Sequence, residues 1–360
     1  MSKLSDLVFT IPEEHHSWYG FVAPRGFFRG TTMMPKARLY MDFTAINKPL
    51  PMEVPHTHHA VDEYIVFTNA DMTNFWEFDA EIDIWLGDDN EHMEHFLIDS
   101  PTLIRIPPKL YHCPINFRKI NPDKPIVFSA IYMDGDWSKI TPRKLPNGSE
   151  DFQYDGAGVR RCVKDRSKEC IYCGKCFSER MDAAEAQGET SQAEASTIDL
   201  LKPYYDMANA PRTGNFDKYV FPFTPELHSD PRFLSPRAKF YGASDMPESR
   251  LVYKYEIIQQ PCEIGELHMH HGVEEYLWFT GADIARFFDF DAEIEISLGY
   301  SPDKLETFTI TKPTIIRVPS EVWHSAVKIK RLGAPINFTP MYQHGVYGRV
   351  LPDGKLVTGN

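Results

Sequence analysis

Histidines and carboxylates recur in one pattern that could bind a metal ion. The stretches PHTHHAVDEYIVF, from Pro55, and LHMHHGVEEYLWF, from Leu267, each place a His-x-His pair ahead of a carboxylate and an apolar run. Residues i and i+2 of an extended strand point to the same face, so the two imidazoles of a pair can converge on one ion. Imidazole with carboxylate suits Mn, Fe, Co, Ni or Zn. The pattern therefore predicts a divalent transition metal, among Fe, Mn, Ni and Zn, in each stretch.

A further histidine completes each set, because His112 and His324 both follow a strand-like apolar run. The carboxylate could be either of two neighbours, with Asp62 and Glu274 as the alternatives. Successive strand residues face opposite ways, so only one carboxylate of each pair can reach the metal. We prefer Glu63 and Glu275. The predicted ligands are His56, His58, Glu63 and His112 in the first set, and His268, His270, Glu275 and His324 in the second.

Each ligand of the second set lies 212 residues beyond its counterpart, and this offset extends over much of the chain. FDAEIDIWLG, from Phe78, matches FDAEIEISLG, from Phe290, and SPTLIRIPPKLYH, from Ser100, matches KPTIIRVPSEVWH, from Lys312. Self-similarity of this length indicates a duplicated domain. The predicted units are an N-terminal domain over residues 1–140, a cysteine-rich and helix-prone insert over 141–231, and a C-terminal domain over 232–360.

Both repeats have the sequence character of β-structure. Runs such as RLYMDFTAI, EYIVFTNA and TLIRIPP are rich in β-branched and aromatic residues and are bounded by Pro, Gly, Asn and Asp. Several short strands at this spacing are typical of sandwiches and barrels. We therefore predict an all-β fold with two tandem antiparallel barrels.

Two short motifs in each repeat carry a resemblance to a known family. HTHHAVDE, from His56, resembles the first cupin motif, and PPKLYHCPIN, from Pro107, resembles the second, with Lys109 where glycine is usual. PSEVWHSAVK, from Pro319, is similar, with Glu321 at the glycine place. The resemblance implies a bicupin, with two double-stranded β-helix barrels that each hold a metal in the mouth. The missing glycines predict a longer or differently shaped turn before each histidine.

The reaction is less well defined than the fold, because one fold hosts many chemistries. Three histidines and one carboxylate leave coordination positions for water, an oxygen-bearing substrate or O₂. We predict a metal-dependent enzyme acting on a small organic molecule, aromatic or carboxylate in character, with dioxygenase-like chemistry. The alternatives are a redox-neutral isomerase, decarboxylase or lyase, and a non-catalytic module that binds metal and ligand.

Four further residues are candidates for catalysis. His59 and His271 occupy the same turn position in the two repeats and could act as bases, or could be exposed or secondary to the ligands. Arg105 and Arg317 occupy matching places in LIRIPP and IIRVPS, where an arginine either faces solvent, pairs with a carboxylate or anchors an anionic substrate.

The insert contains a cysteine cluster with the spacing C-x7-C-x2-C-x2-C. Four thiolates so close together can hold a tetrahedral Zn or an iron–sulfur cluster. Free thiols or a redox pair are the alternatives. The cysteines concerned are Cys162, Cys170, Cys173 and Cys176.

Charge and hydropathy exclude several classes of partner. The formal net charge is −13, which disfavours nucleic acid and anionic membranes. No apolar run approaches the ~20 residues of a membrane helix. The first residues also lack the apolar core of a secretory signal, so the predicted location is cytoplasmic. The resemblance to cupins, which often pair through sheet edges, adds a homodimer as an expectation.

Overall fold

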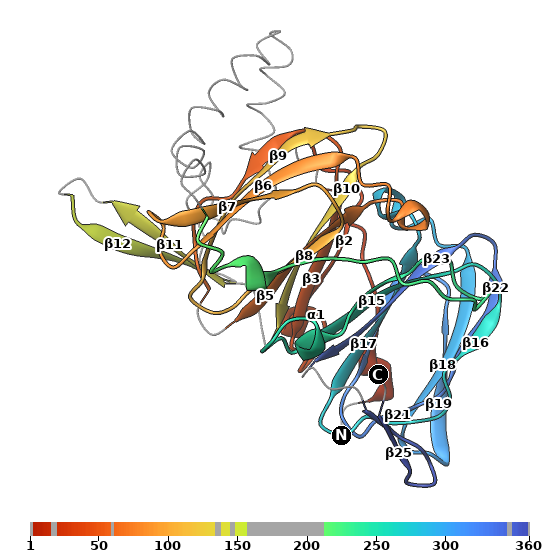
Figure 1. Cartoon of the computed structure of the whole chain (residues 1–360). Coiled ribbons are helices and arrows are strands. Elements are labelled where there is room, and N and C mark those ends of the chain that lie inside the picture. The colour runs from red at the N-terminus through yellow and green to blue at the C-terminus, as the bar shows by residue number, and fades with distance from the viewer. Residues whose placement is uncertain are drawn as a thin grey trace.

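The computed structural model describes residues 3–15, 20–58, 61–133, 138–144, 148–156, 212–343 and 348–358. Within these ranges antiparallel strands dominate, and they form two double-sheet barrels that follow one another along the chain (Figure 1). The predicted all-β fold class is confirmed. The predicted cluster of Cys162, Cys170, Cys173 and Cys176 lies outside the described residues.

The N-terminal barrel consists of a six-stranded sheet facing a four-stranded sheet. Alternate residues of both sheets point inward and form one apolar core that includes Ile65, Phe67, Ile84 and Phe117. The larger sheet has the order β13 (Val220–Pro222), β8 (Thr102–Ile106), β5 (Asp62–Asn69), β10 (Ile126–Met133), β3 (Leu39–Ile46) and β2 (Gly26–Arg29), and the smaller has β4 (Leu50–Met52), β9 (Tyr111–Ile120), β6 (Ala80–Gly87) and β7 (Met93–Ile98).

The C-terminal barrel repeats this plan around a second core that includes Leu277, Phe279, Ile294 and Ile316. A short strand, β21 (Trp323–His324), pairs with the smaller sheet beside the main path. The larger sheet has the order β1 (Val8–Thr10), β20 (Thr314–Val318), β17 (Glu274–Gly281), β23 (Ile336–Gln343), β15 (Leu251–Ile258) and β14 (Ala238–Phe240), and the smaller has β16 (Cys262–Ile264), β22 (Val327–Leu332), β18 (Ala292–Ser301) and β19 (Lys304–Ile310).

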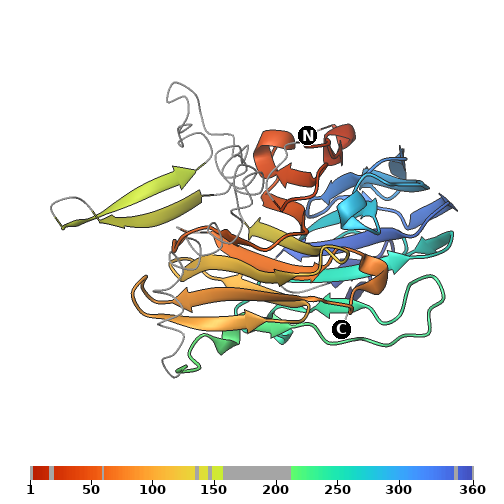
Figure 2. The same ribbon diagram turned by 90° about the horizontal axis from the view of Figure 1, so that it is seen from above.

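Short helices and two hairpins complete the described structure. Each hairpin follows the last long strand of its barrel in the chain, and the first one, yellow-green in Figure 2, projects away from the N-terminal barrel. The helices are α1 (Gly30–Met33) and five 3₁₀ turns, η1 (Leu4–Leu7), η2 (Met72–Asn74), η3 (Asp217–Tyr219), η4 (Gly242–Ser244) and η5 (Ile284–Arg286). The hairpins are β11 (Ser138–Lys144) with β12 (Glu150–Gly156), and β24 (Gly348–Val350) with β25 (Leu356–Thr358).

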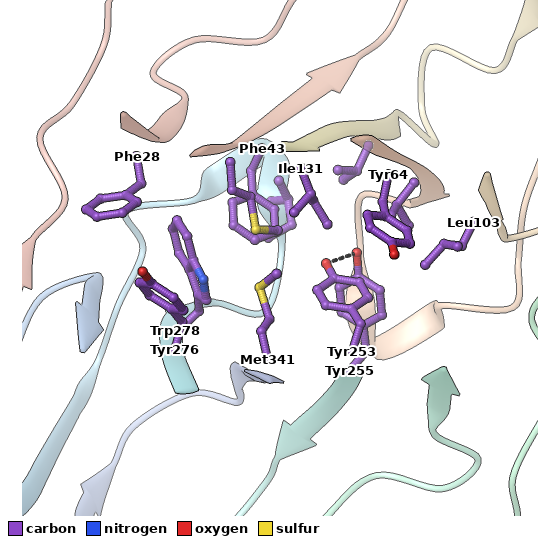
Figure 3. Close-up of a cluster of buried hydrophobic side chains, with 14 of the residues drawn as sticks. Phe28, Phe43, Tyr64, Leu103, Ile131, Tyr253, Tyr255, Tyr276, Trp278 and Met341 are labelled. Carbon is purple, nitrogen blue, oxygen red and sulfur yellow. Dashed lines mark hydrogen bonds between the residues drawn. The ribbon is translucent and has the colours of Figure 1, made fainter. Parts of the chain in front are cut away.

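The two larger sheets pack against each other through a third apolar core (Figure 3). In β5, Tyr64 and Val66 face this interface, whereas Ile65 and Phe67 face the interior of their own barrel. All eight residues of β5 are buried as a result. A strand covered on both faces reads as a continuous apolar run, which explains the sequence EYIVF.

The barrels also exchange strands. β1, from the start of the chain, pairs with β20 of the C-terminal barrel, and Leu7 is buried in that barrel's core. β13 lies ahead of the C-terminal repeat in sequence but pairs with β8, and Phe216 is buried in the N-terminal core. The division at 1–140, 141–231 and 232–360 stays a prediction. Each barrel includes one edge strand from outside its predicted range, β13 in the N-terminal barrel and β1 in the C-terminal barrel.

Candidate metal centres

Three histidines of the N-terminal barrel converge on a single point. His56 and His58 precede β5, and His112 lies in β9 on the facing sheet. His56 and His112 pair as an isolated bridge, with backbone N–H···O distances of 3.1 and 3.0 Å, so the two segments are fixed together. One ring nitrogen from each histidine lies within 4.8 Å of the others, and all three side chains are buried.

Glu63, the second residue of β5, contributes a carboxylate to this group. Its Oε2 lies 2.8 Å from His58 Nε2 and 3.1 Å from His112 Nε2. Its neighbour Asp62 faces the other way, toward the interface between the barrels, and pairs with Arg105. The structure thus places Glu63, and not Asp62, among the histidines, as strand alternation requires.

The C-terminal barrel builds the same arrangement. His268, His270 and His324 have ring nitrogens within 4.8 Å of one another, and all three are buried. Glu275 Oε2 lies 3.2 Å from Nε2 of both His270 and His324. Glu274 faces the interface and pairs with Arg317.

Backbone carbonyls fix the tautomer of several of these histidines. Nδ1 lies 2.7 Å from the Val54 oxygen in His56, 2.7 Å from the Glu266 oxygen in His268 and 2.8 Å from the Gly348 oxygen in His270. A carbonyl oxygen only accepts, so Nδ1 carries the proton and Nε2 presents a lone pair to the centre. In the neutral form of His270 the Nε2 lone pair faces a Glu275 oxygen at 3.2 Å, and either a proton or a metal cation between them would stabilise the pair. The donor set fits a divalent metal on this ground.

Burial and mutual proximity shift the pKa values of these groups. Burial, reinforced by His112, lowers the pKa of His56 well below its usual range, and burial lowers the pKa of His268 to about 4. Burial alone would raise the pKa of Glu63, but His58 and His112 outweigh it and hold that pKa well below its usual value. Burial thus favours the neutral form of His56 and His268, and the Glu63 carboxylate stays ionised, which is the protonation state that a metal needs.

A tyrosine flanks each carboxylate in a cross-strand row. Tyr132 of β10 lies opposite Glu63, Tyr40 of β3 lies opposite Tyr132, and the Tyr132 hydroxyl hydrogen-bonds to Glu63. In the C-terminal barrel Tyr342 of β23 lies opposite Glu275. Sequence reasoning missed these tyrosines, although the match of PIVFSAIYMDG with PINFTPMYQHG, which aligns Tyr132 with Tyr342, carried the signal.

The turn before each third histidine differs from the one predicted. Lys109 and Glu321 adopt positive φ values of 75° and 67°, the conformation that glycine takes most readily. Their backbone N–H groups donate to the oxygens of His58 and His270 at 3.0 and 2.8 Å. The expected longer or reshaped turn is therefore wrong, because both side chains accept the left-handed backbone and the turn still holds the His-x-His segment.

The structure does not bring Arg105 or Arg317 to the histidine groups. The Arg105 guanidinium donates to Asp62 at 3.1 Å and to the Pro247 oxygen at 3.3 Å, on the interface face of the sheet. Arg317 does the same with Glu274, at 2.7 Å, and the Pro35 oxygen, at 3.4 Å. Both arginines thus join the two barrels.

Of the two turn histidines, His59 and His271, the structure describes only His271. The His271 side chain is 74% exposed and lies 3.5 Å from Glu321, so it points to solvent. His59 lies outside the described residues.

Comparisons with known proteins rest on structure alone. No protein-family model matches the sequence, and a comparison with curated proteins finds no match. Among solved structures, an oxalate decarboxylase of Bacillus subtilis, described for its Mn(II) centres, matches with a TM-score of 0.56 at 14% identity over 97% of this chain and 80% of that one. The oxalate decarboxylase of Lactobacillus farciminis, solved as a formate complex, matches with a TM-score of 0.53 at 12% identity over 97% and 89% of the two chains.

The fold is that of a bicupin. At these identities the likeness establishes the architecture only, and the duplicated barrels with paired histidine groups agree with it. No helix of the bicupin's described residues is long and apolar enough to cross a membrane.

Proposed function

We propose that this bicupin is a metal-dependent enzyme that carries out a redox-neutral reaction on a small carboxylate. Decarboxylation is the preferred reaction. The convergence of three buried histidines and one glutamate in each barrel carries the proposal. The solved structures that share the fold support the choice of reaction, because they are named as oxalate decarboxylases. The dioxygenase-like chemistry favoured by the sequence ranks below it, since the solved structures that share the fold are named as decarboxylases.

His56, His58, Glu63 and His112 would hold the metal in the N-terminal barrel, and His268, His270, Glu275 and His324 would hold it in the C-terminal barrel. Three imidazoles and a carboxylate suit manganese among the predicted metals. A bound divalent ion would supply a Lewis acid for a substrate carboxylate oxygen.

The chain's own residues would orient and desolvate the substrate. The Val54 and Glu266 carbonyls keep the Nε2 lone pairs of His56 and His268 directed at the centre. The Tyr132 hydroxyl holds the Glu63 carboxylate in place through a hydrogen bond. Because the histidines are buried, water has restricted access to the centre.

Metal content tests the site. The anaerobically purified protein is analysed by mass spectrometry together with His112→Ala, His324→Ala and, as a matched control, His271→Ala, whose side chain is exposed. We expect one ion per barrel, the loss of one ion in each of the first two variants and no loss in the control. Unchanged stoichiometry in both site variants would overturn the assignment.

Product analysis tests the reaction. The manganese-loaded protein is incubated with oxalate, malonate or a 2-oxo acid, and released CO₂ is measured alongside dissolved O₂. We expect CO₂ without matching O₂ consumption, and no release from the double variant His112→Ala/His324→Ala. Consumption of O₂ in proportion to substrate would instead favour a dioxygenase.

A further inference from the structure

The inner faces of the two larger sheets differ in charge beside otherwise matching centres. Asp42 of β3 and Lys254 of β15 are counterparts at the 212-residue offset. Asp42 accepts a hydrogen bond of 3.0 Å from the Ala130 N–H and acts electrostatically on Glu63. Lys254 acts in the same way on Glu275, and its ammonium lies 5.7 Å from the centre of the Tyr342 ring. Asp42 and Lys254 thus each interact electrostatically with the glutamate of their own group.

The neighbouring positions enlarge this difference. Asp42 lies opposite Phe27 of β2, whereas Lys254 lies opposite Lys239 of β14. Two residues further along the same face, Thr44 is replaced by Glu256. In the N-terminal barrel the three positions are Phe27, Asp42 and Thr44, with a formal charge of −1. In the C-terminal barrel they are Lys239, Lys254 and Glu256, with a formal charge of +1.

A second cation approaches the C-terminal group from the hairpin. Arg349 of β24 acts electrostatically on His270, and one of its terminal nitrogens lies 3.3 Å from Glu266. Its Nε is buried and has no hydrogen-bond partner among the described residues. At the matching place in the N-terminal barrel, Lys139 is 4% exposed and pairs with Glu53. A buried guanidinium N–H without a partner is costly, and an anion would satisfy it.

Tyr342 lies between Lys254 and the histidine group. Its ring lies 5.5 Å from that of His270, and it neighbours Lys254 on the next strand. Lys254 and Arg349 therefore flank the same centre from the sheet and from the hairpin. Cations beside a buried metal-type centre favour a small carboxylate, which accepts charge-assisted hydrogen bonds.

We propose that the C-terminal barrel is the carboxylate-binding site and that Lys254 is its specificity-determining residue, with Arg349 as second contact. The N-terminal barrel, with Asp42 in the corresponding place, disfavours the same anion. This inference rests on the proposed function, since the anion would lie beside the metal, but it concerns binding and not turnover.

Carboxylate binding tests the inference without activity. Oxalate and malonate are titrated calorimetrically into full-length, manganese-loaded protein and into Lys254→Met, Lys254→Arg and Asp42→Asn. Lys304→Met, which removes an exposed lysine of the same barrel, is the matched control. Melting temperature and metal content are recorded for every variant, so that misfolding or metal loss is recognised.

We expect Lys254→Met to weaken carboxylate binding by at least about tenfold, the effect of losing a hydrogen bond to a charged group. Lys254→Arg should restore most of the affinity, and Lys304→Met should bind as the original chain does. Equal affinity in Lys254→Met, or no binding in the original chain, overturns the inference. Binding that depends on Lys254 without any CO₂ release would overturn the proposed function and leave the inference standing.

Discussion

The two barrels share a ligand geometry but not its surroundings. Both place three buried histidines around a glutamate on the second residue of a central strand. Both also set a tyrosine beside that glutamate on the next strand. One strand further, Tyr40 and Asp42 occur in the first barrel where Val252 and Lys254 occur in the second.

The difference teaches that duplication has preserved what would hold a metal and changed what would select a ligand. Ligand residues must converge within a few tenths of an ångström, so the strands that carry them cannot vary freely. Residues one strand away only set charge and shape. The following predictions test how independent the two barrels are.

The exchange of edge strands gives the largest expected effect. Leu7 belongs to the N-terminal repeat by sequence but packs in the C-terminal core, so Leu7→Ala should lower protection from hydrogen exchange in β20 and β17. Loss of a buried leucine side chain should cost about 3 kcal/mol of unfolding free energy.

Phe216→Ala is the reciprocal variant, because Phe216 packs in the N-terminal core. Exchange should then increase in β8 and β5. If Leu7→Ala loosened only the N-terminal barrel, the exchange of strands would be refuted.

The second prediction concerns the pH dependence of the unfolding free energy, to which Asp42 contributes. Burial raises the pKa of Asp42 to about 6, so between pH 4 and 6 the folded state binds more protons than the unfolded state. Stability is thus lost as the pH rises through this range. Asp42→Asn should be more stable than the original chain at pH 7 by up to about 3 kcal/mol, and the difference should vanish below pH 4.

Urea unfolding of metal-free protein at several pH values measures this difference. Lys254→Met should be more stable than the original chain at neutral pH, because burial lowers the pKa of Lys254, and this difference should vanish only as the pH rises to the ordinary lysine value of 10.5. A pH-independent effect of Asp42→Asn would contradict the prediction.

The tyrosine row gives an effect of intermediate size. Tyr132→Phe removes the hydrogen bond to Glu63 and should weaken metal binding in the N-terminal barrel about tenfold, the usual consequence of losing a partner of a ligand. Competition with a chelator, in a His324→Ala background, measures this barrel alone. Tyr40→Phe is the control, because Tyr40 lies one strand further from Glu63.

Much of this comparison could be predicted from the sequence, and the reasons for the rest are physical. Strand periodicity and the 212-residue offset predicted the two barrels. Alternation also favoured Glu63 over Asp62 for the histidine group, where the structure places it. The roles of Arg105 and Leu7 depend on contacts between the barrels, and a pattern within one repeat carries no information about the other barrel's surface.

The turn before the third histidine shows another limit, and its glycine variant gives the smallest expected effect. A non-glycine residue in the left-handed region costs about 1 kcal/mol, which Lys109 and Glu321 tolerate because their N–H groups are held by the His-x-His carbonyls. Lys109→Gly relieves that strain but gives the unfolded chain more freedom, so the unfolding free energy should change by less than about 1 kcal/mol. Lys109→Val should lose about 1–3 kcal/mol, since a β-branched residue fits this conformation poorly. Equal stability of the glycine and valine variants in urea would show that the turn has relaxed to another conformation, and the histidine it positions would then bind metal more weakly.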